Sequence, residues 1–417
     1  MQKDQYKKII KCRLCSGKIK KILELPNVPI GNDLQKNKIK SLSLAEYPLV
    51  INKCKSCNHF QLSISINPNI LYKKNYTYLS GVGKNFIEHF EKYSNWVIKR
   101  ANLNINDLVV DVGSNDGTCL SFFQKKKLKV CGVDPAYKPA KISNLNGIEC
   151  INDFFNEKVS RKILKYHGKP KLITSHNVLA HIEELDKTFK LIYNLLEVNG
   201  FFCFEVGYFV SVLQKNNFDT IYHEHLDYHT ANSIVLFLNK IGFSVKSITT
   251  NNIQGGTIRI LTKKQKKIGN TKIVEKFTEN EFNILYNNNL VKQFKYNLKE
   301  NIKNLKEYLN LIKKNKLKII GYGAPTKAAL LSKILQVDPG FLKYSFEDNP
   351  LKIDKYIPKT KIKVIHFDKI IMNKFDVVFL FAWNFHETII EKLKKNLNKG
   401  HNMIIIIPVP KIKIIKI

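Results

Sequence analysis

The sequence predicts an α/β protein with a small N-terminal metal-binding module, a central doubly wound sheet and a second α/β domain at the C-terminus. Two cysteine pairs lie near the N-terminus, apolar runs alternate with helical stretches through the middle, and a strand, a glycine turn and a helix recur after residue 316. At roughly 150 residues per domain, 417 residues suffice for about two to three domains. We place them at 1–75, 76–265 and 266–417.

The composition is that of an ordinary globular protein. Hydrophobic residues make up 44% of the chain and charged residues 25%. No apolar run approaches the roughly 20 residues that span a bilayer, and the N-terminus lacks the apolar core of a signal peptide. We therefore expect a cytoplasmic protein without a membrane partner. The sequence leaves the oligomeric state open between monomer and dimer.

The net charge of +35 raises the hypothesis of a nucleic-acid partner. However, only four of the 69 basic residues are arginine, the side chain that binds phosphates and bases in a bidentate manner. The lysines are scattered through the chain together with many Asn and Ile residues, which favours compositional drift over a binding surface. We predict no specific nucleic-acid partner. The four arginines are Arg13, Arg100, Arg161 and Arg259.

The cysteines fall into two groups. Four lie in apolar stretches and are typical of small buried hydrophobic residues: Cys119, Cys131, Cys150 and Cys203. The pairs Cys12-x-x-Cys15 and Cys54-x-x-Cys57 supply four thiolates from two tight turns, the donor set of a closed structural zinc site. Two disulfides or four incidental thiols are the alternatives, and a reducing compartment disfavours the disulfides. We predict zinc on these four cysteines, with His59 as a weaker substitute ligand and a β-rich fold between the pairs.

Residues at successive strand ends predict a nucleotide-like cofactor in the central domain. The apolar run 108–112 leads into Asp111-Val-Gly113-Ser114-Asn115-Asp116-Gly117-Thr118, a strand, a glycine turn and a helix start. Glycines allow a backbone to approach a ligand closely. The next strand, 129–133, ends in Asp134, where an acid is well placed to hold two ribose hydroxyls. The ends of strands 148–151 and 171–175 follow, and a fifth strand is expected at 200–206.

A dense group of proton-transfer side chains follows the fifth predicted strand. Tyr222, His223, Glu224, His225, Tyr228 and His229 lie within eight residues. An extended segment would place Tyr222 and Glu224 on one face, whereas a helical turn would pair Tyr222 with His225. Histidine is a suitable general base, and a carboxylate can orient it. We predict catalysis; a metal site or a solvated polar loop is the alternative.

These motifs resemble class I S-adenosylmethionine-dependent methyltransferases, and more narrowly the sugar C-methyltransferases that alkylate nucleotide-linked 4-keto-deoxyhexoses. The resemblance covers nearly the whole chain, in order. It rests on the cysteine pairs, the Asp111–Thr118 loop and five further motifs: Tyr76-Thr-Tyr78, Asn177-Val-Leu-Ala-His181, Tyr222-His-Glu-His225-Leu-Asp-Tyr228, Gly255-Gly-Thr-Ile-Arg259 and Gly321-Tyr-Gly-Ala-Pro-Thr-Lys327.

The resemblance implies methylation at carbon 3 of a nucleotide-sugar through an enolate, with S-adenosylmethionine as donor. His225 would remove the proton, Glu224 would support it, Tyr222 and His181 would hydrogen-bond the keto oxygen, and Tyr76 would close the pocket. Whether His225 or Glu224 is the base stays open, and His181 could instead cap a helix. Substrate contacts are expected from Tyr78, Arg259 and Lys327. Cofactor contacts are expected from Asp111, Gly113, Ser114, Asn115, Gly117, Asp134, Asp153, Phe154 and Asn177.

The C-terminal third predicts a second α/β unit behind a helical linker at 266–316, and the resemblance implies that this unit is Rossmann-like. The strand 317–320, the turn at Gly321-Tyr-Gly323 and the helix 328–335 are followed by further strands at 343–346, 377–381 and 402–407. The turn alone is a weak dinucleotide signal, because the third glycine position is unfilled. The resemblance implies a cradle for the nucleotide-sugar; a purely structural turn is the alternative. An RNA-binding protein or RNA methyltransferase with a zinc knuckle remains the competing function, and an oxidoreductase is a weaker one.

Overall fold

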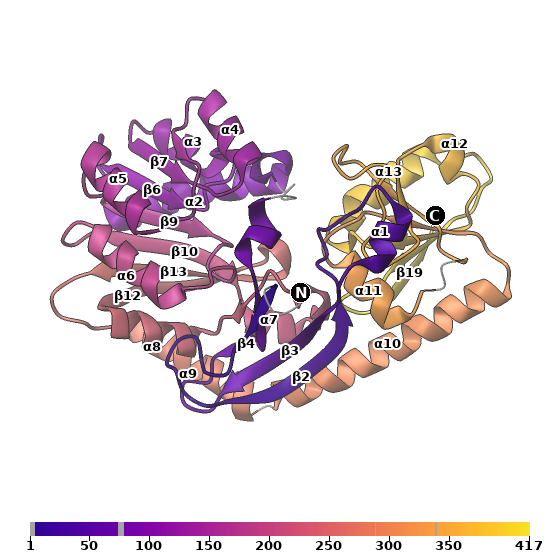
Figure 1. Cartoon of the computed structure of the whole chain (residues 1–417), viewed down its shortest axis with the longest axis horizontal. Helices are drawn as coiled ribbons and strands as arrows, with labels where there is room; N and C mark the ends of the chain where they lie inside the picture. Colours follow the sequence, from indigo (N-terminus) through magenta and orange to yellow (C-terminus); the bar gives the residue numbers. More distant parts are fainter. Residues whose placement is uncertain (1–4, 74–78, 288, 338–339) are drawn as a thin grey trace. The chain divides into compact units, whose positions relative to one another are not determined.

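The computed structural model describes residues 5–73, 79–287, 289–337 and 340–417. The chain forms two compact units. The first consists of Met1–Ile22, Ile51–Val210 and Glu224–Asn288, and the second of Leu23–Val50, Ser211–His223 and Asn289–Ile417. The chain therefore passes between the units several times, and the division into 1–75, 76–265 and 266–417 stays a prediction. Figure 1 shows the elements coloured along the sequence.

The N-terminal segment is rich in β-structure, as predicted for the residues between the cysteine pairs. A four-stranded sheet has the order β11-β4-β3-β2, and β1 pairs with β5 in a separate two-stranded sheet. Buried and half-buried residues largely alternate along β3, the period of a strand with one packed face. The strands are β1 (Tyr6–Lys8), β2 (Ile19–Val28), β3 (Tyr47–Cys54), β4 (Phe60–Leu62), β5 (Ile64–Ile66) and β11 (Asp227–Tyr228); α1 (Lys38–Ser43) precedes β3.

The central sheet has seven strands in the order β12-β13-β10-β9-β6-β7-β8. Five are parallel and lie where the sequence predicts them: β6 (Leu108–Val112), β7 (Lys129–Val133), β8 (Cys150–Ile151), β9 (Leu172–His176) and β10 (Phe201–Gly207). The strand order reverses between β6 and β9, so their carboxyl ends flank the crevice where such sheets bind ligands. The antiparallel strands β12 (Phe243–Asn251) and β13 (Thr257–Lys264) were not predicted.

Helices pack on this sheet and bury its apolar strands. Every residue of β6 is buried, which is why the run is apolar without alternation. Phe90 and Tyr93 of α2 pack with Leu120 and Phe123 of α3 against this strand in one core cluster. The helices of the unit are α2 (Lys84–Ala101), α3 (Thr118–Gln124), α4 (Tyr137–Leu145), α5 (Glu157–His167), α6 (Leu185–Leu195), α8 (Ala231–Ile241) and α9 (Lys272–Phe282).

The second unit contains a six-stranded sheet in the order β16-β15-β14-β17-β18-β19. Numbered along the chain, this is the 3-2-1-4-5-6 order of a dinucleotide-binding sheet, with β19 antiparallel at the edge. The prediction of a Rossmann-like domain is confirmed. The strands are β14 (Ile319–Tyr322), β15 (Tyr344–Glu347), β16 (Lys363–His366), β17 (Val377–Leu380), β18 (Ile404–Ile407) and β19 (Lys413–Lys416); the helices α11 (Ala328–Leu335), α12 (Lys369–Met372) and α13 (His386–Asn396) accompany them.

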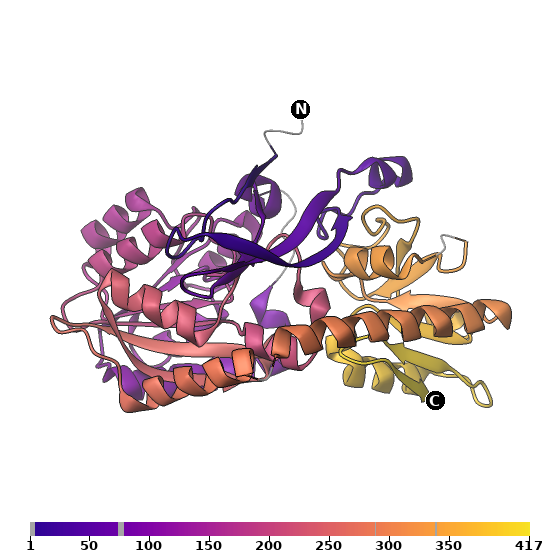
Figure 2. The same ribbon diagram turned by 90° about the horizontal axis from the view of Figure 1, so that it is seen from below.

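The linker predicted as one or two helices contains α9 and then α10 (Leu290–Lys314), which Figure 2 shows along its length. Leu290, Phe294, Leu298, Leu305 and Leu309 of α10 are buried. Their spacing places them on one face, so α10 lies with an apolar stripe against its own unit and the lysines between them face away.

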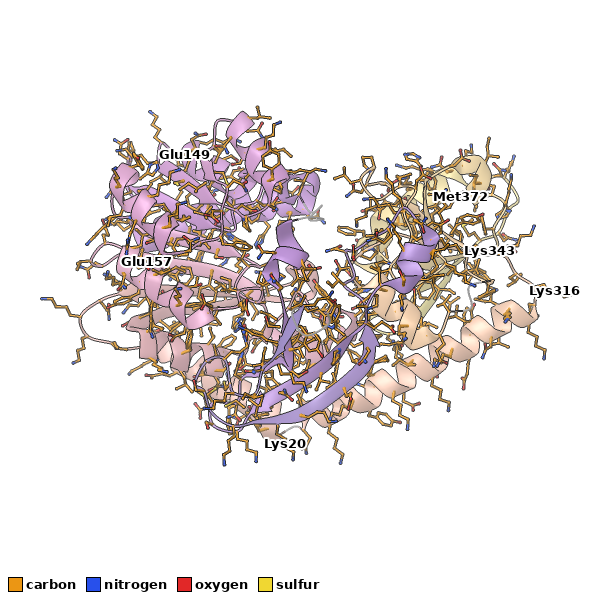
Figure 3. The ribbon with its side chains drawn as sticks, in the orientation of Figure 1. Lys20, Glu149, Glu157, Lys316, Lys343 and Met372 are labelled. Atoms are coloured by element: carbon orange, nitrogen blue, oxygen red, sulfur yellow. The ribbon has the colours of Figure 1, made fainter. Side chains whose placement is uncertain are left out.

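Exposed lysines lie on separate elements. Lys20 of β2, Lys316 after α10 and Lys343 before β15 are all exposed and are labelled in Figure 3. The absence of a nucleic-acid partner stays a prediction. Over 5–73, 79–287, 289–337 and 340–417, none of the helices combines the length and apolar character that crossing a membrane requires.

Candidate active site

The loop between β6 and α3 is a turn that requires glycine. Gly113 and Gly117 both have φ of +78°, in the left-handed region. A Cβ on Gly113 would lie 2.2 Å from Cγ2 of Val178, and one on Gly117 would lie 2.5 Å from Oγ of Ser143. The missing side chains therefore allow the loop to pack closely on the segment that follows β9 at Gly113 and on α4 at Gly117.

Asp134 ends β7 and faces this loop. Its Oδ2 accepts a hydrogen bond from the Asn115 amide at 2.9 Å, and its Oδ1 accepts one from the Ala136 amide at 2.8 Å. Burial raises the pKa of Asp134 to about 6, although both amides favour the ionised form. A carboxylate at the end of the second strand is the group that binds ribose hydroxyls in nucleotide-binding sheets.

The other predicted cofactor residues divide into two sets. Asp153 and Phe154 are half-buried directly after β8, the strand beside β7. In contrast, Asp111 accepts a hydrogen bond from Thr174 Oγ1 at 2.7 Å, and Ser114 Oγ lies 3.4 Å from Cys150 Sγ. These two side chains hold the loop in place, and a contact from either to a cofactor stays a prediction. Asn177 has φ of +56° and donates its amide to the Glu205 carbonyl.

One part of the loop's surroundings was not predicted. Asn115 Oδ1 accepts a hydrogen bond from the Ser80 amide at 3.0 Å, and Asp116 Oδ2 accepts one from the Gly81 amide at 2.8 Å. A Cβ on Gly81 would lie 2.7 Å from Thr118 Oγ1, so this position also requires close packing. The glycine pair Gly81 and Gly83 ahead of α2 was the available signal.

We expect cofactor affinity to depend on pH through Asp134. The pKa of Asp134 in the folded protein, about 6, lies above the ordinary 3.8. Ionisation of this carboxyl therefore destabilises the cofactor-free protein as the pH rises from about 4 to above 6. Ribose hydroxyls need the ionised form, so binding weakens as pH falls below about 6, approaching tenfold per unit if only that form binds. Calorimetric titration of S-adenosylmethionine across this range should show the step. Asp134→Asn should bind weakly at every pH; a wild-type affinity that is flat across the range would contradict this prediction.

The Tyr222–Tyr228 motif begins with a turn and ends in β11. His223 and Glu224 are buried, whereas Tyr222 and His225 are half-buried. The exposure pattern follows the turn alternative, in which Tyr222 and His225 are the presented residues. Tyr222 and His223 belong to the second unit, and Glu224 and His225 to the first.

His223 has a structural environment within the second unit. Its Nε2 lies 3.2 Å from the Pro48 carbonyl oxygen, and its ring packs edge-on against Tyr47 with 5.8 Å between centroids. Burial lowers the pKa of His223 to about 4. The ring is therefore neutral at physiological pH and anchors the motif to its own unit.

His181 and His225 lie together in the first unit, with 5.0 Å between ring centroids. His181 Nδ1 lies 2.6 Å from the carbonyl oxygen of Glu224. This nitrogen must carry the proton, because a carbonyl oxygen only accepts. Burial lowers the pKa of His181, against the carbonyls of Glu224 and Asn177, so the ring is neutral at physiological pH. The first helix after β9, α6, begins at Leu185 with Glu184 at its N-cap, so His181 does not cap it.

A short segment joins this histidine pair to the cofactor loop. At one end, Val178 occupies the space beside Gly113. At the other end, the Ala180 carbonyl accepts hydrogen bonds from the Leu226 amide at 2.7 Å and the Asp227 amide at 3.3 Å. Residues 177–182 therefore connect the loop after β6 to the turn that carries His225, all within the first unit.

The four predicted zinc ligands come together. The sulfur atoms of Cys12, Cys15, Cys54 and Cys57 all lie within 4.8 Å of one another. The Cys12–Cys57 and Cys15–Cys54 sulfur distances are both 3.5 Å. This is too long for a disulfide bond of about 2.05 Å and close to the roughly 3.8 Å edge of a tetrahedron with Zn–S bonds of about 2.3 Å. The donor set fits zinc and leaves no open position.

His59 does not belong to this cluster, contrary to its expected role as a substitute ligand. Its Nε2 lies 2.8 Å from Asp227 Oδ1, and both side chains are fully buried. Asp227 also pairs with Arg13. Burial opposes ionisation of Asp227, but Arg13 and His59 hold the pKa of this carboxyl well below its usual range.

Arg259, predicted to contact substrate, lies in a buried ion pair. Its Nε lies 2.6 Å from Glu205 Oε1, and its guanidinium lies 4.9 Å from the ring centroids of both Tyr93 and Trp96. Glu205 also lies 2.6 Å from His89 Nε2. Burial opposes ionisation of Glu205, but the His89 hydrogen bond and nearby positive charges lower its pKa to about 2. This arrangement stabilises the sheet, and a substrate contact from Arg259 stays a prediction.

Lys327, also predicted to contact substrate, is buried within the second unit. Its Nζ lies 3.1 Å from Asp219 Oδ2 and 2.5 Å from Asn384 Oδ1. It also lies 3.9 Å from the ring centroid of Trp383, whose indole N–H donates to Asp219 at 2.5 Å. Burial lowers the pKa of Lys327 and Asp219 raises it. Tyr76 and Tyr78, the remaining predicted site residues, lie outside the described residues.

We expect Lys327→Met to destabilise the protein by about 3–5 kcal/mol, because it leaves the Asp219 carboxylate buried without its cation. Lys333→Met is the matched control: Lys333 lies in α11, the helix that follows Lys327, and pairs with Glu46 at 2.8 Å but is 44% exposed, so its loss should cost about 0–1 kcal/mol. Denaturant unfolding measures both. A Lys327→Met protein of unchanged stability but raised KM for its second substrate would instead support a substrate contact.

Three family models match the chain in order. A zinc-binding domain matches residues 12–72, a methyltransferase domain matches 87–248, and a C-methyltransferase C-terminal domain matches 252–408. A curated relative, the C-methyltransferase NovU of Streptomyces niveus, is 26% identical over 412 residues, which is 98% of each chain. Together, the three matched domains and the full-length relative identify the chain as a C-methyltransferase.

Part of this C-methyltransferase is also similar to solved methyltransferase structures. Magnesium protoporphyrin IX methyltransferase from Synechocystis, with bound S-adenosylhomocysteine, is 16% identical and matches 43% of this chain and 83% of its own at a TM-score of 0.33. The plantazolicin methyltransferase BpumL is 11% identical and matches 43% of this chain and 84% of its own at a TM-score of 0.35.

The predictions of a methyltransferase fold, a zinc-binding module and a C-methyltransferase activity are confirmed by the family models and the curated relative. S-adenosylmethionine is the methyl donor. Its contacts with Gly113, Asn115 and Asp134 stay a prediction. The matches do not favour the RNA-binding or oxidoreductase alternatives.

Proposed function

We propose that this C-methyltransferase acts on carbon 3 of a nucleotide-linked 4-keto-deoxysugar, in the biosynthesis of deoxysugars for surface polysaccharides or natural products. The observation that carries the proposal is the half-buried His225, packed on His181 and joined to the cofactor loop by residues 177–182. Methylation of carbon requires a carbanion equivalent, and a base beside the cofactor site can generate one next to a ketone. The sugar class rests on the motifs shared with the sugar C-methyltransferases.

His225 would act as the general base. It takes the proton from carbon 3, and the electron pair of the broken C–H bond forms the C3–C4 double bond while the carbonyl electrons move onto oxygen. When bound, the donor supplies a methyl group on a positively charged sulfur. Carbon 3 would then form the new bond with that methyl group while the methyl–sulfur bond breaks and its electron pair stays on sulfur, which leaves as a neutral thioether. The ketone would reform, and His225 would return its proton to solvent. Glu224 is more deeply buried than His225, which supports His225 as the base.

Tyr222 would donate a hydrogen bond to the keto oxygen as it gains negative charge. His181 is less suited to this role than the sequence analysis expected. Its Nδ1 proton is committed to the Glu224 carbonyl, and the Nε2 of a neutral ring only accepts. We therefore propose that His181 orients His225 by ring contact, with Glu224 supporting both. Closure of the pocket by Tyr76 stays part of the proposal.

Isotope exchange tests the proposal. The enzyme is incubated in deuterated water with a panel of 4-keto-6-deoxy sugar nucleotides, first alone and then with S-adenosylmethionine. We expect deuterium to enter at carbon 3 and one methyl group to be added there when the donor is present. Methylation at oxygen, or methyl transfer to RNA and to none of the sugars, would contradict the proposal. Protein stripped of S-adenosylmethionine serves as the control for the exchange arm.

A further inference from the structure

We propose that Arg13, which lies inside the first cysteine pair, is a positioning residue that ties the zinc-binding turn to the His181–His225 pair. The inference rests on the proposed catalytic role of that pair. It gives the zinc-binding turn a part in the reaction without placing the metal near the substrate.

The turn presents Arg13 in a fixed direction. The Cys12 amide donates to the Gly17 carbonyl, and the Ser16 amide donates to the Cys12 carbonyl, both at 2.9 Å. The amide of Arg13 itself donates to Gln61 Oε1 at 2.8 Å. The backbone that carries the guanidinium is therefore held on both sides, by the zinc-binding turn and by β4.

The guanidinium forms hydrogen bonds near both histidines of the His181–His225 pair. Its Nε donates to the two carboxylate oxygens of Asp227, at 2.9 and 3.1 Å. A terminal nitrogen donates to the carbonyl oxygen of Ile182. Ile182 directly follows His181, and Asp227 lies two residues after His225. One side chain thus binds the backbone next to His181 and a side chain two residues from His225.

Both partners of the Arg13–Asp227 ion pair are buried. The Arg13 side chain is 7% exposed and the Asp227 side chain is fully buried. A buried ion pair is stable only when its geometry and hydrogen bonds are complete. Three bonds in two directions require the planar guanidinium fork, which a lysine ammonium cannot reproduce.

The composition gives independent support. Lysine outnumbers arginine so strongly that only four of the 69 basic residues are arginine. Two of the four, Arg13 and Arg259, pair with buried carboxylates. Half of the few arginines in this lysine-rich chain therefore pair with a buried carboxylate, and Arg13 is one of them.

The test is Arg13→Lys, with Arg161→Lys as the matched control because Arg161 pairs with Glu157 on an exposed helix face. We expect Arg13→Lys to keep its zinc by elemental analysis and its S-adenosylmethionine affinity within about twofold, while kcat falls about 10- to 100-fold. Hydrogen exchange at the Leu226 and Asp227 amides, which bond to Ala180, should become faster in Arg13→Lys and not in Arg161→Lys.

A double variant separates positioning from general stability. In the His225→Asn background, Arg13→Lys should lower the residual turnover by less than twofold, since the residue it positions is already gone. An equal loss of kcat in both backgrounds, unchanged exchange, or loss of zinc from Arg13→Lys would each overturn the inference. If Arg13→Lys does not fold, Asp227→Asn is measured in the same way. The exchange measurement needs no substrate, so its result is independent of whether the proposed sugar is turned over.

Discussion

Replacing His225 with asparagine is expected to lower turnover by about 10²- to 10⁴-fold, the usual contribution of a positioned general base. Affinity for S-adenosylmethionine should stay within about twofold, because residues 177–182 lie between His225 and the cofactor loop. Asparagine keeps a polar side chain of similar reach but cannot take up a proton. The measurements are kcat from methyl transfer and the dissociation constant from calorimetric titration.

The exchange step separates His225 from Glu224 as the base. If His225 removes the proton, His225→Asn loses deuterium exchange at carbon 3 even without the methyl donor, and Glu224→Gln keeps part of it. If Glu224 is the base, the two results are reversed. His366→Asn, at an exposed position on β16 in the second unit, should leave both rates unchanged. Loss of cofactor binding in His225→Asn would count against the assigned role.

The sequence predicts the parts of this fold whose signals are local. The strand that contains Asp111, the glycine turn and the acid Asp134 follow one another within 27 residues, because backbone geometry and strand-end chemistry leave marks at fixed short spacings. The cysteine pairs are similar, since two turns are enough to bring four thiols together. By contrast, β12 and β13 form an antiparallel pair without a strand–turn–helix pattern, and the sequence analysis missed them.

Side-chain partners far apart in sequence could not be predicted. Arg13 and Asp227 are 214 residues apart, and nothing near either residue marks the pair. Lys327 and Arg259 were assigned to the substrate because they end shared motifs, yet both meet buried carboxylates. A motif shows that a residue is needed, but only the tertiary contacts show whether it serves the ligand or the fold.

Removing the metal is expected to unfold the N-terminal module, which would be as large an effect as the loss of His225. Strands β1, β4 and β5 have only three residues each. So few buried side chains give little stability without a bound metal or a covalent cross-link. Zinc bound by four thiolates contributes about 10–16 kcal/mol in small metal-binding domains. We expect a strong chelator, or Cys54→Ala, to release the zinc and to abolish hydrogen-exchange protection in β3 and β4. Elemental analysis and exchange mass spectrometry measure the two effects.

Turnover should be lost with the metal even though the closed four-sulfur site cannot bind substrate. The reason is that the metal site supports the strands beside the catalytic turn. Cys54 ends β3, and β4 pairs with β11, the strand formed by Asp227 and Tyr228 after that turn. Cys203→Ala is the matched control, since Cys203 is a buried cysteine outside the cluster and its loss should leave the zinc in place. A metal-free protein that kept β3 and β4 protected and still methylated its substrate would refute a structural role for zinc. Partial activity with a folded module would instead show that the metal adds rigidity to a module that is already stable.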